Sequence, residues 1–413
     1  MLVKTLIFSN SIHKEAIVDW EKELKKIDEK ELPIYTILVP MFRETESVRK
    51  LLKHLNDFDY PAEKLDIKLI LEEDDEETFA AAMTQKPSHN FEIIRIPKGQ
   101  LRTKPKALNY AMCFARGEYV TVFDADDEPE KTQLKKVIIT FRIRPKNVAC
   151  LQARLGYYNA DDTWLTRFFS LEYKLLFDFL LHGLQSLNMP LPLGGTSNHI
   201  SIAHLRELGE WDPFNVTEDA DLGIRLAALG LHTEMLDSYT MEEATEAMPA
   251  WLRQRSRWIK GYMQTWLVHI RSPIKLYKTI GARGFWGFQF FIGFASLSFL
   301  TAPIIWLLAL FWWIFPEKFL FPEWLIFLSI ANLLINFLSH WFMMFFCLRV
   351  QKKINYKMLL AAIFYPLYLL LHSVASYIAL RQLIEKPHFW EKTMHGASKI
   401  KKMQKIGRKL VDC

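Results

Sequence analysis

The sequence has few cysteines, and their spacing excludes two kinds of stabilising site. Its 413 residues include only four cysteines, and no two of them are close together: Cys113, Cys150, Cys347 and Cys413. Neither a CxxC metal-binding pattern nor the disulfide framework of a small secreted domain fits this spacing. A reducing compartment fits it best. The apolar run at residues 1–9 is too short for a cleavable signal peptide and lacks a small-residue cleavage site.

Charge is also absent from three long stretches near the C-terminus. Residues 285–315, 324–348 and 358–380 contain no Asp, Glu, Lys or Arg. Each stretch is long enough to cross the hydrocarbon core of a bilayer, which takes roughly 20 apolar residues. Residues 1–284, in contrast, alternate charged and apolar blocks. We therefore expect a membrane protein with a water-soluble N-terminal part and about three transmembrane helices within residues 285–384.

The positions of the basic residues predict the orientation. Arg349, Lys352, Lys353 and Lys357 separate the second and third apolar stretches with no acidic residue among them. The positive-inside rule places this loop and the N-terminal domain in the cytoplasm, in a multi-pass protein of the inner or plasma membrane. Three crossings would leave the basic tail, residues 385–413, outside. The basic residues of the tail favour the cytoplasm, so the count of two, three or four spans stays open, with three preferred. One alternative makes 285–315 an interfacial helix followed by a span and makes 358–380 re-entrant or broken at Pro366.

Apolar runs alternate with helical patterns along residues 33–275. Strands are expected at 33–40, 66–71, 91–96 and 119–123, and helices at 43–55, 107–115 and 222–229. Such alternation predicts an α/β domain with a largely parallel, doubly wound sheet. Residues 1–32 are expected to form a separate segment that contains one charged helix over 12–31.

Three carboxylates follow the central strand directly. Asp124, Asp126 and Asp127 come after Tyr119–Phe123 and therefore lie at the edge where open α/β sheets bind ligands. Like charges this close repel one another, and a divalent cation relieves that repulsion, since Mg²⁺ takes carboxylate and phosphate oxygens. The alternative is a solvated acidic turn.

Two further charged clusters are expected at the same edge. The acidic run 72–77 follows the second strand, and Arg102, Lys104 and Lys106 lie at the start of the next helix. Lysines at a helix N-terminus suit a phosphate. Together the clusters predict a site for a metal and a diphosphate, although surface solvation would also account for the charges.

Two later motifs add candidate catalytic and binding residues. Asp219, in Thr217-Glu218-Asp219, lies just before or at the start of a helix, where it serves either as a helix cap or as a general base. Gln254, Arg257 and Trp258 share one face of a later helix at helical spacing. An arginine beside an aromatic ring suits a phosphate and a sugar, whereas the tryptophans of this helix could equally belong to the core or the membrane interface.

In this order, the motifs resemble those of the processive family 2 glycosyltransferases, the group of cellulose, chitin and hyaluronan synthases. The resemblance lies in an Asp after the second strand, a D-x-D, a T-E-D and a Q-x-x-R-W, followed by membrane helices. The segments Leu193–His199 and Trp390–Gly396 are also similar to those of cellulose-synthase-like proteins. The resemblance implies a GT-A nucleotide-sugar-binding domain over 33–275.

The resemblance also implies roles for individual residues. Asp219 would be the catalytic base, and Glu218 and Asp126 would be further catalytic residues. Asp124 and Asp126 would hold UDP with Mg²⁺ or Mn²⁺. The donor would be bound by Pro40, Glu44, Asp74, Lys104 and Lys106. The diphosphate and the acceptor would be bound by Gln254, Arg257, Trp258 and His199. Trp390–Gly396 would be either a mobile loop over the active site or a surface turn.

These expectations amount to an inverting, metal-dependent hexosyltransferase that uses UDP-glucose or a related UDP-sugar to build a β-glycan. Transfer to a membrane lipid is the alternative, and an inactive scaffold for polysaccharide export is the third hypothesis. Few spans make a self-contained export channel doubtful, so a second copy, an export subunit or a preceding segment would complete it. No nucleic-acid partner is expected.

Overall fold

The structure, a computed structural model, consists of two compact units. The described residues are 2–11, 18–45, 47–85, 90–99, 102–315, 322–349 and 355–389. The sheet unit comprises the described residues within 15–159 and 191–250, and the helical unit comprises those within 1–14, 160–190 and 251–391.

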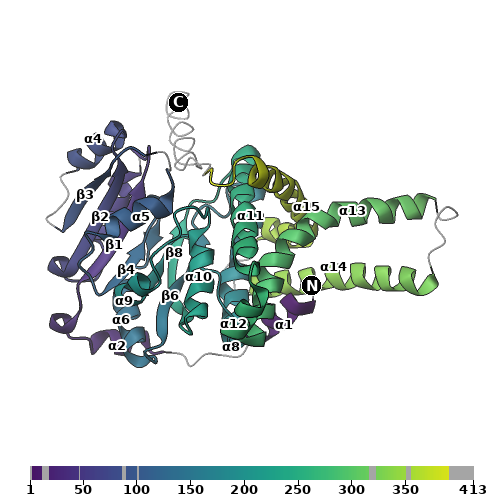
Figure 1. The fold of residues 1–413 in the computed structure, drawn as a ribbon, viewed down its shortest axis with the longest axis horizontal. Coiled ribbons are helices and arrows are strands. Elements are labelled where there is room, and N and C mark those ends of the chain that lie inside the picture. Colours follow the sequence, from purple (N-terminus) through teal and green to yellow (C-terminus); the bar gives the residue numbers. More distant parts are fainter. Residues whose placement is uncertain are drawn as a thin grey trace. The chain divides into compact units, whose positions relative to one another are not determined.

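An eight-stranded sheet forms the centre of the sheet unit (Figure 1). Its strands lie in the order β3-β2-β1-β4-β7-β6-β8-β5. Their bounds are β1 Tyr35–Met41, β2 Leu65–Glu72, β3 Phe91–Ile96, β4 Tyr119–Val122, β5 Glu128–Pro129, β6 Val148–Tyr157, β7 Asn198–Ser201 and β8 His232–Glu242. The four strands expected from the sequence are all present, with small differences in their ends.

The first half of the sheet is parallel, as the sequence predicts. β1 pairs in parallel with β2 on one side and with β4 on the other, with Met41 opposite Leu71 and Leu38 opposite Val122. The carboxyl ends of these three strands therefore meet at one edge. The loops that follow them carry the acidic residues identified above.

The second half of the sheet is mixed, which corrects the expectation of a largely parallel sheet. β7 runs antiparallel to both β4 and β6, and β5 runs antiparallel to β8, while β6 and β8 are parallel. β7 has only four residues, so its apolar pattern is too short to be recognised in the sequence.

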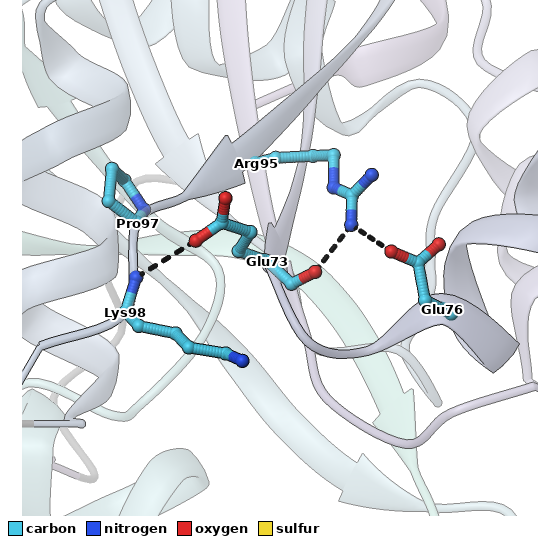
Figure 2. Close-up of a pocket in the computed structure, with 5 residues that line it drawn as sticks. All are labelled: Glu73, Glu76, Arg95, Pro97 and Lys98. Atoms are coloured by element: carbon cyan, nitrogen blue, oxygen red, sulfur yellow. Dashed lines mark hydrogen bonds and ion pairs between the residues drawn. The ribbon is translucent and has the colours of Figure 1, made fainter.

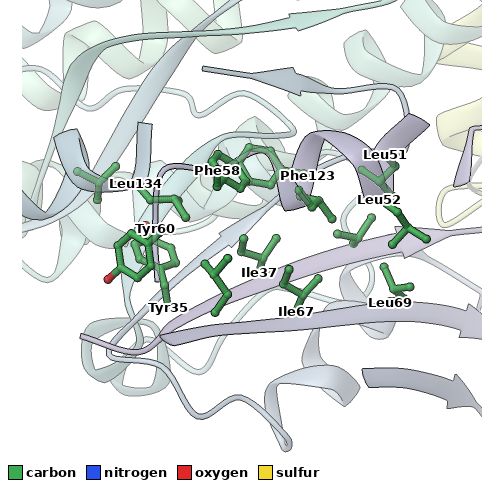
Figure 3. Close-up of a cluster of buried hydrophobic side chains, with 14 of the residues drawn as sticks. Tyr35, Ile37, Leu51, Leu52, Phe58, Tyr60, Ile67, Leu69, Phe123 and Leu134 are labelled. Carbon is green, nitrogen blue, oxygen red and sulfur yellow. The ribbon is translucent and has the colours of Figure 1, made fainter. Parts of the chain in front are cut away.

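Helices cover both faces of the sheet, and each face has its own apolar core. Ile37 and Val39 of β1 point into one core, and Leu38 between them points into the other, as the alternation of a strand requires. Figure 3 shows the first core, in which Phe58 and Phe123 lie against side chains of the parallel strands. The helices of the unit are α2 Trp20–Lys25, α3 Val48–Asn56, α4 Glu76–Thr84, α5 Lys104–Met112, α6 Gln133–Ile143, α9 Ile202–Glu207 and α10 Glu218–Ala228.

The helical unit contains segments that were predicted, from the sequence, to belong to other domains. Residues 160–190 and 251–275, expected in the soluble domain, cluster with the hydrophobic helices. So does helix α1, Leu2–Ser11, whereas residues 18–31 form two short helices rather than part of one long one. The Cβ of any larger residue at Gly183 would collide with the carbonyl oxygen of Ile7, so glycine allows α1 and α8 to cross closely. The remaining helices are α7 Trp164–Tyr173, the π-helix η3 Lys174–Leu180, α8 Leu181–Ser186, α11 Met248–Ile270, α12 Pro273–Phe288, the π-helix η4 Gln289–Gly293, α13 Phe294–Ile314, α14 Glu323–Arg349 and α15 Tyr356–Glu385.

Three helical segments of the described chain are long and apolar enough to cross a membrane. They are Pro273–Ile314, Phe327–Arg349 and Tyr356–Glu385, and each contains most or all of one uncharged stretch (Figure 1). The first changes direction at Gly281, whose φ of 70° is open to glycine but strained for other residues. The third continues through Pro366 as one helix, which is against the alternative of a break at that proline.

Several predicted features lie outside the described residues. These are the loop at 316–321, residues 350–354 of the basic loop 349–357, the segment Trp390–Gly396 and the rest of the basic tail.

Candidate functional site

The carboxylates after β4 form an ordered turn rather than a loose acidic loop. The backbone N–H of Asp124 donates to Asp127 Oδ2 at 2.7 Å, and Thr196 Oγ1 donates to the same oxygen. Asp126 Oδ2 accepts from the backbone N–H of Glu243 at 3.1 Å. Asp127 is 1% exposed, whereas the side chain of Asp124 is 43% exposed. Asp127 therefore shapes the turn, and Asp124 is the carboxylate that a ligand can reach.

The turn concentrates negative charge that the protein itself does not neutralise completely. Burial, with the charges of Asp124 and Asp126 adding to it, raises the pKa of Asp127 well above its usual range. The pKa of Glu242 is raised by burial and by the same three carboxylates. Within the described part of the chain, Asp127 Oδ1 and Glu242 Oε1 are buried and accept no hydrogen bond.

These observations fit a divalent cation that shares its coordination with a ligand. No three His, Cys, Asp or Glu side chains of the described chain are arranged to enclose a metal by themselves. Mg²⁺ commonly takes one or two carboxylates and fills its other positions with water and phosphate oxygens, so Asp124 and Asp126 would be its predicted protein ligands beside a diphosphate. Sequence reasoning overlooked Glu242, although the adjacent acids Glu242 and Glu243 at a strand end were a visible signal.

Lys104 connects this turn to the second acidic motif. Its Nζ lies 2.6 Å from Asp124 Oδ1 and donates to the carbonyl oxygen of Gly195 at 2.7 Å. Burial alone would lower the pKa of Lys104, but the carboxylates of Asp124, Glu218 and Asp219 outweigh burial and raise it. The ammonium group is therefore firmly charged and lies among three acidic residues.

Asp219 lies at the same place through its contact with Gly195. The Cβ of a larger residue at position 195 would stand 3.2 Å from Asp219 Oδ2 and 4.0 Å from Lys104 Nζ. Asp219 belongs to the first turn of α10, where the N-cap residue is Thr217, so Asp219 is not the cap. Its Oδ1 accepts from the N–H of Ala220 at 2.7 Å. The structure thus brings Asp124, Lys104 and Asp219 together at one edge of the sheet unit.

The predicted nucleotide-binding residues lie at the ends of β1 and β2. Asp74 pairs with Arg102 at 2.9 Å, and this guanidinium lowers the pKa of the carboxyl group. Asp75 caps α4 by accepting from the N–H of Thr78 at 3.3 Å, and it also accepts from the N–H of Arg43. Asp74 is therefore the more available of these two aspartates.

Pro40 lies near the carboxyl end of β1 and Glu44 follows that strand, at the edge of the sheet where the nucleotide is expected. The N–H of Glu44 donates to Thr78 Oγ1 at 3.1 Å, and Pro40 is opposite Ile70 in the parallel register. Figure 2 shows a neighbouring open pocket lined by Glu73, Glu76, Arg95, Pro97 and Lys98. In it, the Arg95 guanidinium bridges Glu76 and the carbonyl oxygen of Glu73.

The structure also places Lys106 and His199, two more of the predicted site residues. The Nζ of Lys106 lies beside Gly99, and it is Lys104 that pairs with Asp124. His199, expected to bind the acceptor, is 0% exposed in β7. Its two ring nitrogens lie 2.7 Å from the hydroxyl of Tyr35 and 3.2 Å from Gln133 Oε1, and burial lowers its pKa to about 3. His199 is therefore a satisfied core residue.

Gln254, Arg257 and Trp258 belong to the helical unit. All three lie on α11, as their spacing predicts. Gln254 is 7% exposed, and the ring of Trp258 packs against Phe169 and Tyr173 of α7. Their predicted contacts with diphosphate and acceptor remain a prediction.

Comparison with known proteins identifies relatives among glycosyltransferases. The chain is 26% identical over 266 residues to the "Probable glycosyltransferase YdaM" of Bacillus subtilis, a match that covers 63% of this chain and 61% of that protein. It is 26% identical over 269 residues to a beta-monoglucosyldiacylglycerol synthase of a Nostoc species, covering 63% and 55%. It is 28% identical over 300 residues to the cellulose synthase catalytic subunit (UDP-forming) of Pseudomonas fluorescens, covering 68% and 38%. The matches therefore span less than two thirds of each of these relatives.

A solved structure shows the same fold. The mannosyltransferase PcManGT of Pyrobaculum calidifontis, in complex with GDP-Man and Mn²⁺, superposes with a TM-score of 0.58 at 16% identity, over 93% of this chain and 94% of that one. The sheet unit is thus a GT-A-like α/β domain. Residues 36–200 match glycosyl transferase family 2, and residues 119–380 match glycosyl transferase family group 2. Because the match to residues 119–380 spans more than half of the chain, this protein belongs to glycosyl transferase family group 2.

Proposed function

We propose that this protein transfers a sugar from a UDP-sugar, with UDP-glucose the first candidate, to the end of a growing β-glycan. The transfer takes place at a membrane and inverts the configuration at the anomeric carbon. The observation that carries this proposal is the meeting of Asp124, Lys104 and Asp219 at one edge of the sheet. The carboxylate of Asp219 is suited to act as a base for the acceptor. The ammonium of Lys104 is suited to balance the charge of the leaving diphosphate.

The proposed reaction is a single displacement. The acceptor hydroxyl attacks the anomeric carbon while the carboxylate of Asp219 takes its proton. The bond between that carbon and the phosphate oxygen breaks, and its electron pair leaves with UDP. An oxocarbenium-like transition state, by analogy with glycoside hydrolysis, places growing negative charge on the diphosphate. The Lys104 ammonium stabilises that charge as it develops.

Asp124 and Asp126 are the proposed metal ligands. A Mg²⁺ or Mn²⁺ ion bound by these two carboxylates would neutralise charge on the departing diphosphate. Asp74, Glu44 and Pro40, at the ends of the neighbouring strands, are proposed to contact the nucleotide. One base without a second carboxylate nucleophile favours inversion, so an α-linked donor yields a β-linked product.

Binding of the acceptor is assigned to the motif of α11, which does not by itself distinguish a polymer from a lipid acceptor. Gln254, Arg257 and Trp258 are proposed to bind the diphosphate and the acceptor sugar, and similarity to a cellulose synthase catalytic subunit supports a polymer. A membrane lipid is the second candidate, because a similar relative is a beta-monoglucosyldiacylglycerol synthase and only three candidate spans lie within the described residues. In either case the protein is proposed to lie in the inner or plasma membrane with the sheet unit in the cytoplasm. A second copy or an export subunit is proposed to complete an export path.

The deciding experiment supplies purified protein in lipid vesicles with a panel of radiolabelled nucleotide sugars and then sizes the product. UDP-glucose is expected to give a labelled β-glycan, and excess EDTA is expected to stop its formation. A labelled lipid of fixed size would establish the second candidate. Incorporation from GDP-sugars alone would refute the proposed donor, and full transfer in EDTA would refute the metal.

A further inference from the structure

A buried ion pair anchors the helix that carries Gln254, Arg257 and Trp258. Arg255 of α11 makes two parallel hydrogen bonds to Glu172 of α7, from Nη1 to Oε1 at 2.8 Å and from Nη2 to Oε2 at 2.7 Å. Arg255 is 8% exposed, and both residues belong to the helical unit. Sequence analysis did not single out either residue.

The carboxylate of Glu172 is also bonded by α15. The hydroxyl of Tyr368 donates to Oε2 at 2.8 Å, and His372 Nε2 lies 3.2 Å from Oε1. Trp251 Nε1, one turn before Arg255, donates to the same hydroxyl at 3.1 Å. Glu172 thus joins three helices, α7, α11 and α15, through one fully bonded carboxylate.

The other side of the Arg255 guanidinium faces aromatic rings. It lies 4.8 Å from the ring centre of Trp258, 4.8 Å from that of Phe169 and 5.4 Å from that of Trp251. A guanidinium stacked on a tryptophan is attracted by the π electrons of the ring. Glu172 bonds the guanidinium, and the guanidinium contacts the Trp258 indole beside the rings of Phe169 and Tyr173.

Stability alone does not account for this arrangement. A buried ion pair costs desolvation energy, and its replacement by apolar residues of similar size is often neutral or stabilising. An apolar pair at 172 and 255 would hold the helices together equally well, but it would not hold the indole through a fixed cation.

We propose that Arg255 is a positioning residue for the acceptor: Glu172, Tyr368 and His372 fix its guanidinium, and the guanidinium fixes the ring of Trp258. This inference rests on the proposed function, in which Trp258 stacks on the acceptor sugar. Lysine cannot replace Arg255, because an ammonium neither makes two parallel bonds to a carboxylate nor stacks flat on an indole.

The test compares Arg255→Met, Arg255→Lys and the double variant Glu172→Met/Arg255→Met with wild type in lipid vesicles. The control is Arg381→Met, which removes an exposed arginine of α15 that pairs with Glu385. For each protein we would measure the affinity for UDP, the KM for the acceptor, kcat and the melting temperature. Arg255→Met and Arg255→Lys are expected to raise the acceptor KM about 10-fold to 100-fold, as expected for the loss of 1.4 to 2.8 kcal/mol of binding. UDP affinity is expected to stay unchanged.

The double variant separates positioning from folding. Its melting temperature is expected to recover relative to Arg255→Met, since no buried charge remains, whereas its acceptor KM is expected to stay high. Recovery of both would show that Arg255 acts only on stability and would overturn the inference, as would an unchanged acceptor KM in Arg255→Met. If wild type and Arg381→Met transferred no sugar, the proposed function would fail and the inference with it.

Discussion

Two groups of buried carboxylates, one in each unit, differ in how completely their oxygens are bonded. In the sheet unit, Asp127 and Glu242 have raised pKa values, and within the described chain each has a buried oxygen that accepts no hydrogen bond. In the helical unit, both oxygens of Glu172 are bonded. Burial alone would raise the pKa of Glu172, but the Arg255 guanidinium and the contacts from His372 and Tyr368 outweigh burial and lower it to about 2.

The difference indicates which cluster is prepared for a ligand. A buried carboxylate with incomplete bonding is costly, and it is retained where something else completes it. A carboxylate whose oxygens are all bonded holds helices in place and has no capacity left for a ligand. We therefore assign chemistry to the edge of the sheet and positioning to Glu172.

The largest expected effect is on Asp219, at the edge of the sheet. Asp219→Asn removes the proposed base with little change in shape, so transfer should fall by about 10²- to 10⁴-fold. UDP binding, measured by calorimetry, should be nearly unchanged because Asp219 is not proposed to hold the nucleotide. Full turnover in this variant would remove Asp219 from the mechanism.

The next effect distinguishes Lys104 from Lys106. Lys104→Met removes the ammonium beside Asp124 and should lower kcat by about 10²- to 10³-fold, the usual loss for one group that stabilises transition-state charge. Lys106→Met is the matched control and should cost clearly less. Equal losses in initial-rate measurements would mean that the position of Lys106 beside Gly99 does not reflect the working enzyme.

His199 should behave as a bonded core group rather than as a binding residue. His199→Leu leaves the hydroxyl of Tyr35 and the amide oxygen of Gln133 buried without their partner, at a cost of about 1 to 3 kcal/mol in the free energy of unfolding. Thermal unfolding should show this loss, while the acceptor KM of the folded fraction stays at the wild-type value. A raised acceptor KM with unchanged stability would restore the binding role.

The smallest effect is a pH dependence in the helical unit. Because the pKa of Glu172 is about 2 when folded and 4.5 in its ordinary state, its ionised form stabilises the fold above pH 4.5. That contribution is lost as the pH falls from 4.5 toward 2. The melting temperature of wild type should therefore approach that of Glu172→Gln across this window. A constant difference between the two proteins would show that Glu172 does not titrate as described.

Much of the fold could be predicted because its signals are local. The apolar runs that became β1 to β4, and the acids that follow β2 and β4, lie next to each other along the chain. Parallel pairing then brings the ends of these strands to one edge. The same reasoning could not predict β7, because a four-residue antiparallel strand depends on where the chain returns and not on its own pattern.

The roles of some residues could not be assigned, because the sequence carries no signal for the direction in which a side chain points. Lys104 and Lys106 occupy the same turn of α5, and only the rotation of that helix decides which one reaches Asp124. His199 lies in a motif that resembles a binding segment, but β7 turns its ring into the core. Glu172 and Arg255 are 83 residues apart, so nothing in the sequence pairs them.

The sequence by itself determined the family motifs, the alternation of strands and helices, and the three apolar spans. These depend on composition and spacing, which a single chain displays directly. Only the tertiary structure decided which carboxylates are completed by the protein and which are left for a ligand. Hydrogen bonding, burial and the facing charge are properties of neighbours in space, and long-range packing selects those neighbours.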